Sequence, residues 1–103
     1  MKEDLKKIID TYGIRNQLRK FNEETYELIE AINDYERQKE ACENMGCSKV
    51  HADKKLEHIA EEIGDVRVML YQLQYHYGIE EEDIWDVIKF KTKRQLERIK
   101  NSK

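Results

Sequence analysis

The part of the sequence that decides the fold is residues 18–32, LRKFNEETYELIEAI. Successive residues of a helix are about 100° apart, which places Leu28 on the same side as Phe21. The apolar residues therefore form one stripe, and charged residues fill most of the remaining circumference. Glu24 stands at one border of the stripe, and Glu27 lies about 60° further round. The segment is predicted to be an amphipathic helix with an acidic edge.

A second segment, residues 59–70, repeats this arrangement with the letters IAEEIGDVRVML. Ile59 takes the place of Phe21 at the centre of an apolar stripe. Glu62 then falls at the border of the stripe, and Asp65 lies about 60° beyond it. Carboxylates three residues apart on a helix point the same way. Two such helices packed side by side would therefore bring their acidic edges together.

The whole chain is predicted to be one all-α domain, residues 1–103, because it contains no proline and 40% of its residues are charged. Helices are expected at about residues 3–12, 14–41, 53–77 and 81–99, with a loop over residues 42–52. We expect a four-helix bundle in which the two central helices are antiparallel and the first and last pack around them. The other stripe residues expected in the core are Ile14, Leu18, Ile32, Leu56, Ile63, Val66, Leu70 and Tyr77.

Charge and hydropathy exclude several classes of protein. The net charge is -3, with acidic and basic residues interspersed, which argues against binding to a nucleic-acid polymer. No apolar run approaches the roughly 18 residues that span a membrane, and residues 1–4 lack the apolar core of a signal peptide. The two cysteines are typical of a reduced cytoplasmic protein, so a cytoplasmic location is expected. A single chain of this size has a thin core, and a homodimer or homotetramer is therefore predicted.

The pairs Glu24/Glu27 and Glu62/Asp65 suggest a metal site. Four carboxylates at a helix seam would repel one another and would be costly to desolvate without a cation. Their oxygens suit Mg²⁺, with Mn²⁺ as a second possibility, whereas zinc would require Cys or His at ligand spacing. A di-iron bundle is disfavoured because no Glu has a His three residues later. Spacing alone leaves open a second interpretation, in which these residues only form a solvated acidic face.

Both motifs resemble those of a known family. Residues 18–32 look like the E-E-x-x-E-L signature of the MazG-like, all-alpha NTP pyrophosphatase superfamily, and residues 59–70 resemble its E-E-x-x-D signature. Residues 91–98, KTKRQLER, are similar to the basic end of its short members from phages and Gram-positive bacteria. The resemblance covers about residues 12–99.

The resemblance implies a hydrolase that cleaves an NTP or dNTP to a monophosphate and pyrophosphate, as housekeeping of the nucleotide pool. Carried over by position, its metal ligands would be Glu24, Glu27, Glu62 and Asp65. Which carboxylate also acts as general base is not decided by the sequence, and Glu27 is the candidate chosen here. The alternative is a non-catalytic helical module that binds a metal or nucleotide. The cations predicted to hold the phosphates are Lys20, Lys91, Arg94 and Arg98, although the last three could also be a solvated basic helix end.

Overall fold

The structure, a computed structural model, describes residues 1–46 and 49–102 of the chain. It contains four helices and, over those residues, no strand. The helices are α1 (Lys2–Tyr12), α2 (Ile14–Met45), α3 (Lys49–His76) and α4 (Glu81–Asn101). The all-α prediction is therefore confirmed. No helix in the described part of the chain is long and apolar enough to cross a bilayer.

The helix ends explain which boundaries were predictable. Gly13 separates α1 from α2 with a φ of 85°, and Gly78 follows α3 with a φ of 65°. Glycine adopts a positive φ without the steric cost that a Cβ imposes. Both breaks were therefore visible in the sequence.

The prediction of a long loop over residues 42–52 was wrong within the described residues. α2 continues to Met45, and α3 already begins at Lys49. The small helix penalty of residues such as Asn44 does not end a long helix. α2 stops instead at Gly46, where φ is 75° and the backbone N–H donates to the carbonyl of Cys42. Cys42 is disulfide-bonded in the structure, unlike the reduced cysteine that was expected, while residues 47–48 lie outside the described part of the chain.

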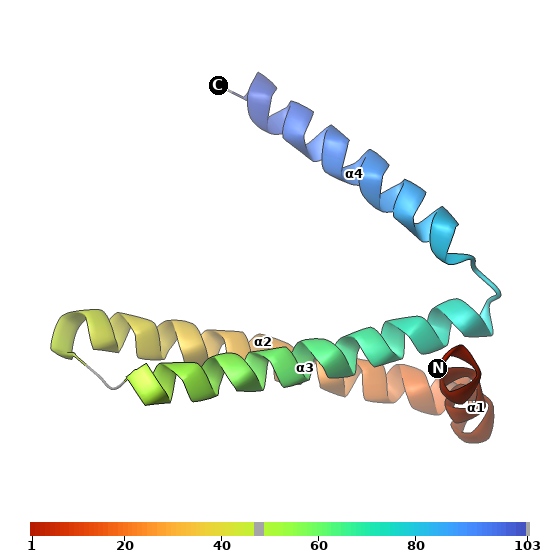
Figure 1. The fold of residues 1–103 in the computed structure, drawn as a ribbon, viewed down its shortest axis with the longest axis horizontal. Coiled ribbons are helices and arrows are strands. Elements are labelled where there is room, and N and C mark those ends of the chain that lie inside the picture. The colour runs from red at the N-terminus through yellow and green to blue at the C-terminus, as the bar shows by residue number, and fades with distance from the viewer. Residues whose placement is uncertain (47–48, 103) are drawn as a thin grey trace.

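α2 and α3 form a long antiparallel hairpin, and α1 packs across its open end (Figure 1). α1 contributes Leu5 and Ile9 to the core, and the hairpin contributes Ala31 and Met69. The Nζ atom of Lys2 on α1 also lies 5.4 Å from the centre of the Tyr75 ring. α1 therefore covers the end of α3 that is opposite the turn between α2 and α3.

The expectation that the last helix packs around the central pair was wrong for a single chain. α4 points away from the hairpin, and none of its described residues is buried (Figure 1). The short connection after α3 directs α4 outward, and the Gln74 Nε2 atom donates to Glu81 Oε2 across it at 3.0 Å. The angle between the helices leaves a groove of about 460 Å³, lined partly by Trp85 and Ile88.

Much of the apolar stripe that was predicted to be core is also uncovered. Six apolar residues of α2 and α3 that are 40–52% exposed, among them five of the stripe residues expected in the core, fall on each helix within about 60° of one another. We call them the outer face: Leu18, Ile29 and Ile32 on α2, and Leu56, Ile63 and Leu70 on α3. The hairpin alone is too thin to bury both of its long sides.

Candidate metal centre

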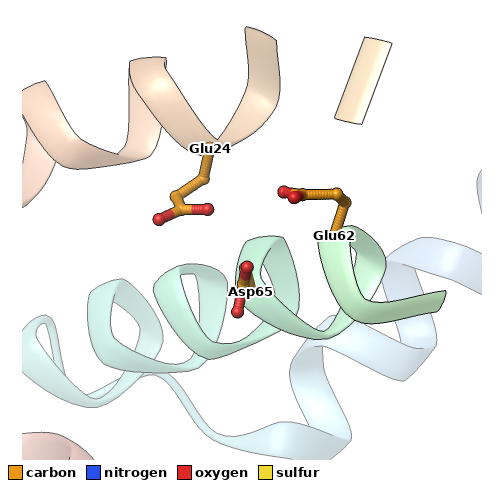
Figure 2. A group of neighbouring side chains, drawn as sticks. All are labelled: Glu24, Glu62 and Asp65. Carbon is orange, nitrogen blue, oxygen red and sulfur yellow. The ribbon is translucent and has the colours of Figure 1, made fainter. Parts of the chain in front are cut away.

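Three carboxylates from the two central helices meet near the middle of the hairpin. Glu24 projects from α2, while Glu62 and Asp65 project from α3 (Figure 2). One oxygen atom from each lies within 4.8 Å of the others. The three-residue spacing puts Glu62 and Asp65 on one side of α3, and the packing of the hairpin brings Glu24 opposite them.

This cluster leaves charged oxygen atoms without partners in the protein. The Glu62 residue is only 8% exposed, Glu24 is half-buried and Asp65 is exposed. The Oε2 atoms of Glu24 and Glu62 are buried and accept no hydrogen bond from the described residues. The His58 Nε2 atom lies 3.9 Å from Glu62 Oε1, which is too long for a hydrogen bond. Buried carboxylate oxygens without partners are costly, so the site favours a cation.

Burial and mutual repulsion both favour the protonated forms. Desolvation is the main cause that raises the pKa of Glu24 above its ordinary value, followed by the charges of Asp65, Glu27 and Glu62. Desolvation is also the main cause that raises the pKa of Glu62, followed by the charges of Glu27 and Asp65. The charge of Lys20 lowers the pKa of Glu24, but its effect is the smallest of those acting there.

These raised pKa values predict how the stability of the metal-free protein depends on pH. The folded protein holds protons on Glu24 and Glu62 more tightly than the unfolded chain, where the ordinary pKa is 4.5. This contribution to stability is therefore fully present below about pH 4.5 and is lost as the pH rises through the raised values. Thermal unfolding in a chelator from pH 4 to pH 8 should show this loss, and Glu24→Gln and Glu62→Gln should reduce it. The exposed Glu23→Gln variant is the control, and an equal pH profile in all four proteins would contradict the prediction.

The donor set fits a hard divalent cation. The three converging groups are carboxylates, and two of them hold a buried oxygen that nothing in the described protein satisfies. Mg²⁺ and Mn²⁺ prefer such oxygen ligands. Cys and His do not join this group of side chains within the described residues, which disfavours zinc.

Glu27, the fourth predicted ligand, is placed differently. Its side chain is exposed, and it does not belong to the group of three oxygens. Its charge nevertheless raises the pKa of both Glu24 and Glu62, so it lies close enough to act on the site.

A cleft of about 430 Å³ opens beside the carboxylates. Glu24 and Asp65 form one part of its wall, and Lys20 lies along the same side of α2. The other lining residues are Ile8, Tyr12, Gln17, Val68, Met69 and Gln72. The sequence analysis did not single out Gln17 and Gln72. Their positions could have been found, because each lies seven residues from a cluster carboxylate, Glu24 or Asp65, and so on nearly the same helix face.

The three cations predicted on the last helix are not brought to this cleft. Lys91, Arg94 and Arg98 lie on α4, and none of the three lines the cleft. Arg94 lies 5.7 Å from the centre of the Phe90 ring, and Arg98 donates to Gln95 Oε1 at 3.2 Å. Within one chain, Lys20 is therefore the predicted phosphate ligand that lines the cleft.

A comparison with known protein families identifies the family to which the chain belongs. The model of the MazG nucleotide pyrophosphohydrolase domain matches residues 14–99. The chain belongs to this family. The match contains all four predicted metal ligands, and it confirms the resemblance found in the sequence. No curated protein and no solved structure matches the chain significantly. MazG membership indicates nucleotide pyrophosphohydrolase activity in general.

Proposed function

We propose that this MazG protein is a Mg²⁺-dependent pyrophosphohydrolase of nucleoside triphosphates. It would convert an NTP or dNTP and water to the monophosphate and pyrophosphate, as a cytoplasmic housekeeping enzyme of the nucleotide pool. The observation that carries the proposal is the meeting of Glu24, Glu62 and Asp65 beside a cleft whose wall includes Lys20. A triphosphate needs such a combination, because its charge requires both a divalent cation and a basic side chain.

The roles follow from position. Glu24, Glu62 and Asp65 would hold the metal, with Glu27 as a further ligand from the adjacent turn of α2. When bound, Mg²⁺ would neutralise the charge of the phosphates and polarise them toward attack. We assign to Glu27 the orientation and deprotonation of the attacking water, since its carboxylate is exposed and lies outside the group of three converging oxygens. Lys20 would bind a phosphate oxygen from the side of α2.

The surface of the chain supports the proposal that the enzyme is a homo-oligomer. The accessible surface is 8600 Å², whereas a compact monomer of 12.5 kDa exposes about 6200 Å². The radius of gyration is 18.0 Å, against about 13 Å for a compact domain of this length. The excess of roughly 2400 Å² per chain is what an obligate homodimer buries on each partner. A second copy would cover the outer face and the groove beside α4.

The same assembly would provide a place for the remaining cations. Because α4 stands apart from its own hairpin, Lys91, Arg94 and Arg98 are free to approach the hairpin of another copy. We therefore propose that these three residues bind phosphates in the assembled enzyme. In the assembly they would offset the charge of the carboxylates and of the triphosphate.

The test of the function is pyrophosphate release from a panel of common NTPs and dNTPs, with and without Mg²⁺. We expect turnover of at least one substrate that is abolished by a chelator and restored by Mg²⁺. We also expect Mg²⁺ to raise the Tm of the protein without substrate, since it binds the folded carboxylate cluster. Stabilisation by Mg²⁺ or by nucleotide without any turnover would instead favour the non-catalytic binding module.

Removal of the Lys20 charge should weaken the interaction of the enzyme with the triphosphate. Lys20→Met keeps the length of the side chain but loses the ammonium group, so we expect kcat/KM to fall by about 10-fold or more. The matched control is Lys39→Met, on the same helix but outside the cleft. Steady-state kinetics would show whether Lys20→Met and Lys39→Met differ, and equal values would contradict the assignment of Lys20.

A further inference from the structure

A buried pair of glutamines bridges α2 and α3 at the cleft. The Nε2 atom of Gln17 donates to Oε1 of Gln72 at 2.7 Å. Gln17 is 5% exposed and Gln72 is 2% exposed, and both line the cleft that contains the carboxylates. Over the described residues, neither amide has an atom that is both buried and without a partner, so the atoms that the pair does not use internally are accessible to a ligand in the cleft.

The pair has hydrogen-bonding capacity that the protein does not use. A glutamine amide offers two N–H donors and a carbonyl acceptor. The only other contact of the Gln72 amide over the described residues is a long one, 3.7 Å from Nε2 to Met69 Sδ. The Oε1 atom of Gln17 accepts no hydrogen bond from the described residues. The pair thus has an acceptor and a donor side by side for a molecule in the cleft.

The distance from the glutamine pair to the carboxylates matches the length of a nucleotide. Gln17 lies seven residues before Glu24, and Gln72 lies seven residues after Asp65. Both spacings correspond to about 10.5 Å along the helix axis. Because α2 and α3 are antiparallel, the two glutamines lie on the same side of the carboxylates. A nucleotide with its phosphates at the acidic end would extend its base toward them, past Lys20.

The remaining wall of the cleft suits a base rather than a second phosphate. Ile8, Val68 and Met69 are apolar, and Tyr12 adds an aromatic ring. Ligand pockets of this size typically combine an apolar lining with a few converging polar groups that fix orientation. Lys20 is the one cation among the described residues that line the cleft, and it lies on the carboxylate side of the glutamine pair.

We propose that Gln17 and Gln72 together bind the hydrogen-bonding edge of the nucleobase. This inference rests on the proposed function for the identity of the ligand as a nucleotide. Each common base carries a donor next to an acceptor on its pairing edge. The two amides can reverse together and still bond to each other, so the pair serves either order of donor and acceptor. The pair recognises the presence of a base edge, and the carboxylates act on the phosphates.

The inference can be tested by binding, independently of turnover. Calorimetry in Mg²⁺ would compare ribose 5-phosphate, which has no base, with the four common ribonucleoside 5′-monophosphates. The wild-type protein should bind the best monophosphate at least about 10-fold more tightly than ribose 5-phosphate. The double variant Gln17→Leu/Gln72→Leu removes both partners of the hydrogen bond, which leaves no orphaned amide and preserves the fold. In the double variant, the preference for the best monophosphate over ribose 5-phosphate should fall by about 10-fold.

Gln38→Leu is the matched control, since it makes the same change on α2 outside the cleft. It should keep the wild-type preference. An unchanged preference in the double variant, or equal binding of ribose 5-phosphate and all four monophosphates by the wild type, would overturn the inference. If the expected preferences are found but no triphosphate is hydrolysed, the base site stands and the proposed reaction fails.

Discussion

Glu62→Gln should lower kcat/KM by at least about 100-fold and, at the same time, raise the Tm of the metal-free protein at pH 7. The activity should fall because the substitution removes a charged ligand from the centre of the carboxylate cluster. The stability should rise because Glu62 is buried, its pKa is raised, and its Oε2 atom has no partner in the described protein. A neutral amide of the same shape removes the repulsion from the neighbouring carboxylates and lowers the cost of desolvation.

Steady-state pyrophosphate release at saturating Mg²⁺ and thermal unfolding in a chelator would measure the two effects. Glu61→Gln is the control, because this neighbour has the same charge but its side chain is 77% exposed. It should change neither quantity substantially. Full activity of Glu62→Gln would remove Glu62 from the set of metal ligands, and a lower Tm would show that its carboxylate stabilises the metal-free fold.

Leu70→Lys should dissociate the enzyme into chains of 12.5 kDa or prevent stable folding. Leu70 is 50% exposed in one chain, and it belongs both to the outer face and to the groove beside α4. On the surface of a true monomer, this change would shift the free energy of unfolding by less than about 0.5 kcal/mol. If a second copy covers the residue, an unpaired lysine would be buried, at a cost of about 3 kcal/mol or more.

Sedimentation over a range of protein concentrations would give the mass, and chemical unfolding would give the free energy. Tyr26→Lys is a suitable control because Tyr26 is 62% exposed on α2 but lies outside the outer face. It should leave the mass unchanged. A wild-type protein that sediments at 12.5 kDa at all concentrations would contradict the homo-oligomer.

The sequence was sufficient for the elements whose signals are local. Gly13 and Gly78 mark helix ends because each adopts a positive φ, and the carboxylates at three-residue spacing are visible in any helical projection. The convergence of Glu24 with Glu62 was predicted from the matched placement of the two acidic edges, although much of the apolar stripe beside each edge is exposed. These predictions needed only the helical period of a single segment, or the similarity of the residue patterns in two segments.

The errors concern properties that are not local. The length of the turn between α2 and α3 depended on Gly46 rather than on the polar residues around it. The departure of α4 could not be foreseen, because an apolar stripe does not specify whether its own chain or another copy covers it. Gln17 and Gln72 were missed for a related reason. The sequence does not show that a polar residue is buried or that it bonds to a residue on another helix.

The residues that match the MazG family do not include all the residues that line the cleft. The family match begins at residue 14, yet Ile8 and Tyr12 of α1 line the cleft. Gly13 joins this helix to the rest with no side chain of its own in the junction. Sequence changes in the first twelve residues can therefore reshape the region around the ligand while every carboxylate stays in place. Substitutions confined to Ile8 and Tyr12 would therefore separate selectivity from turnover in the proposed enzyme, whereas Leu5 and Ile9 are buried in the core and must be retained.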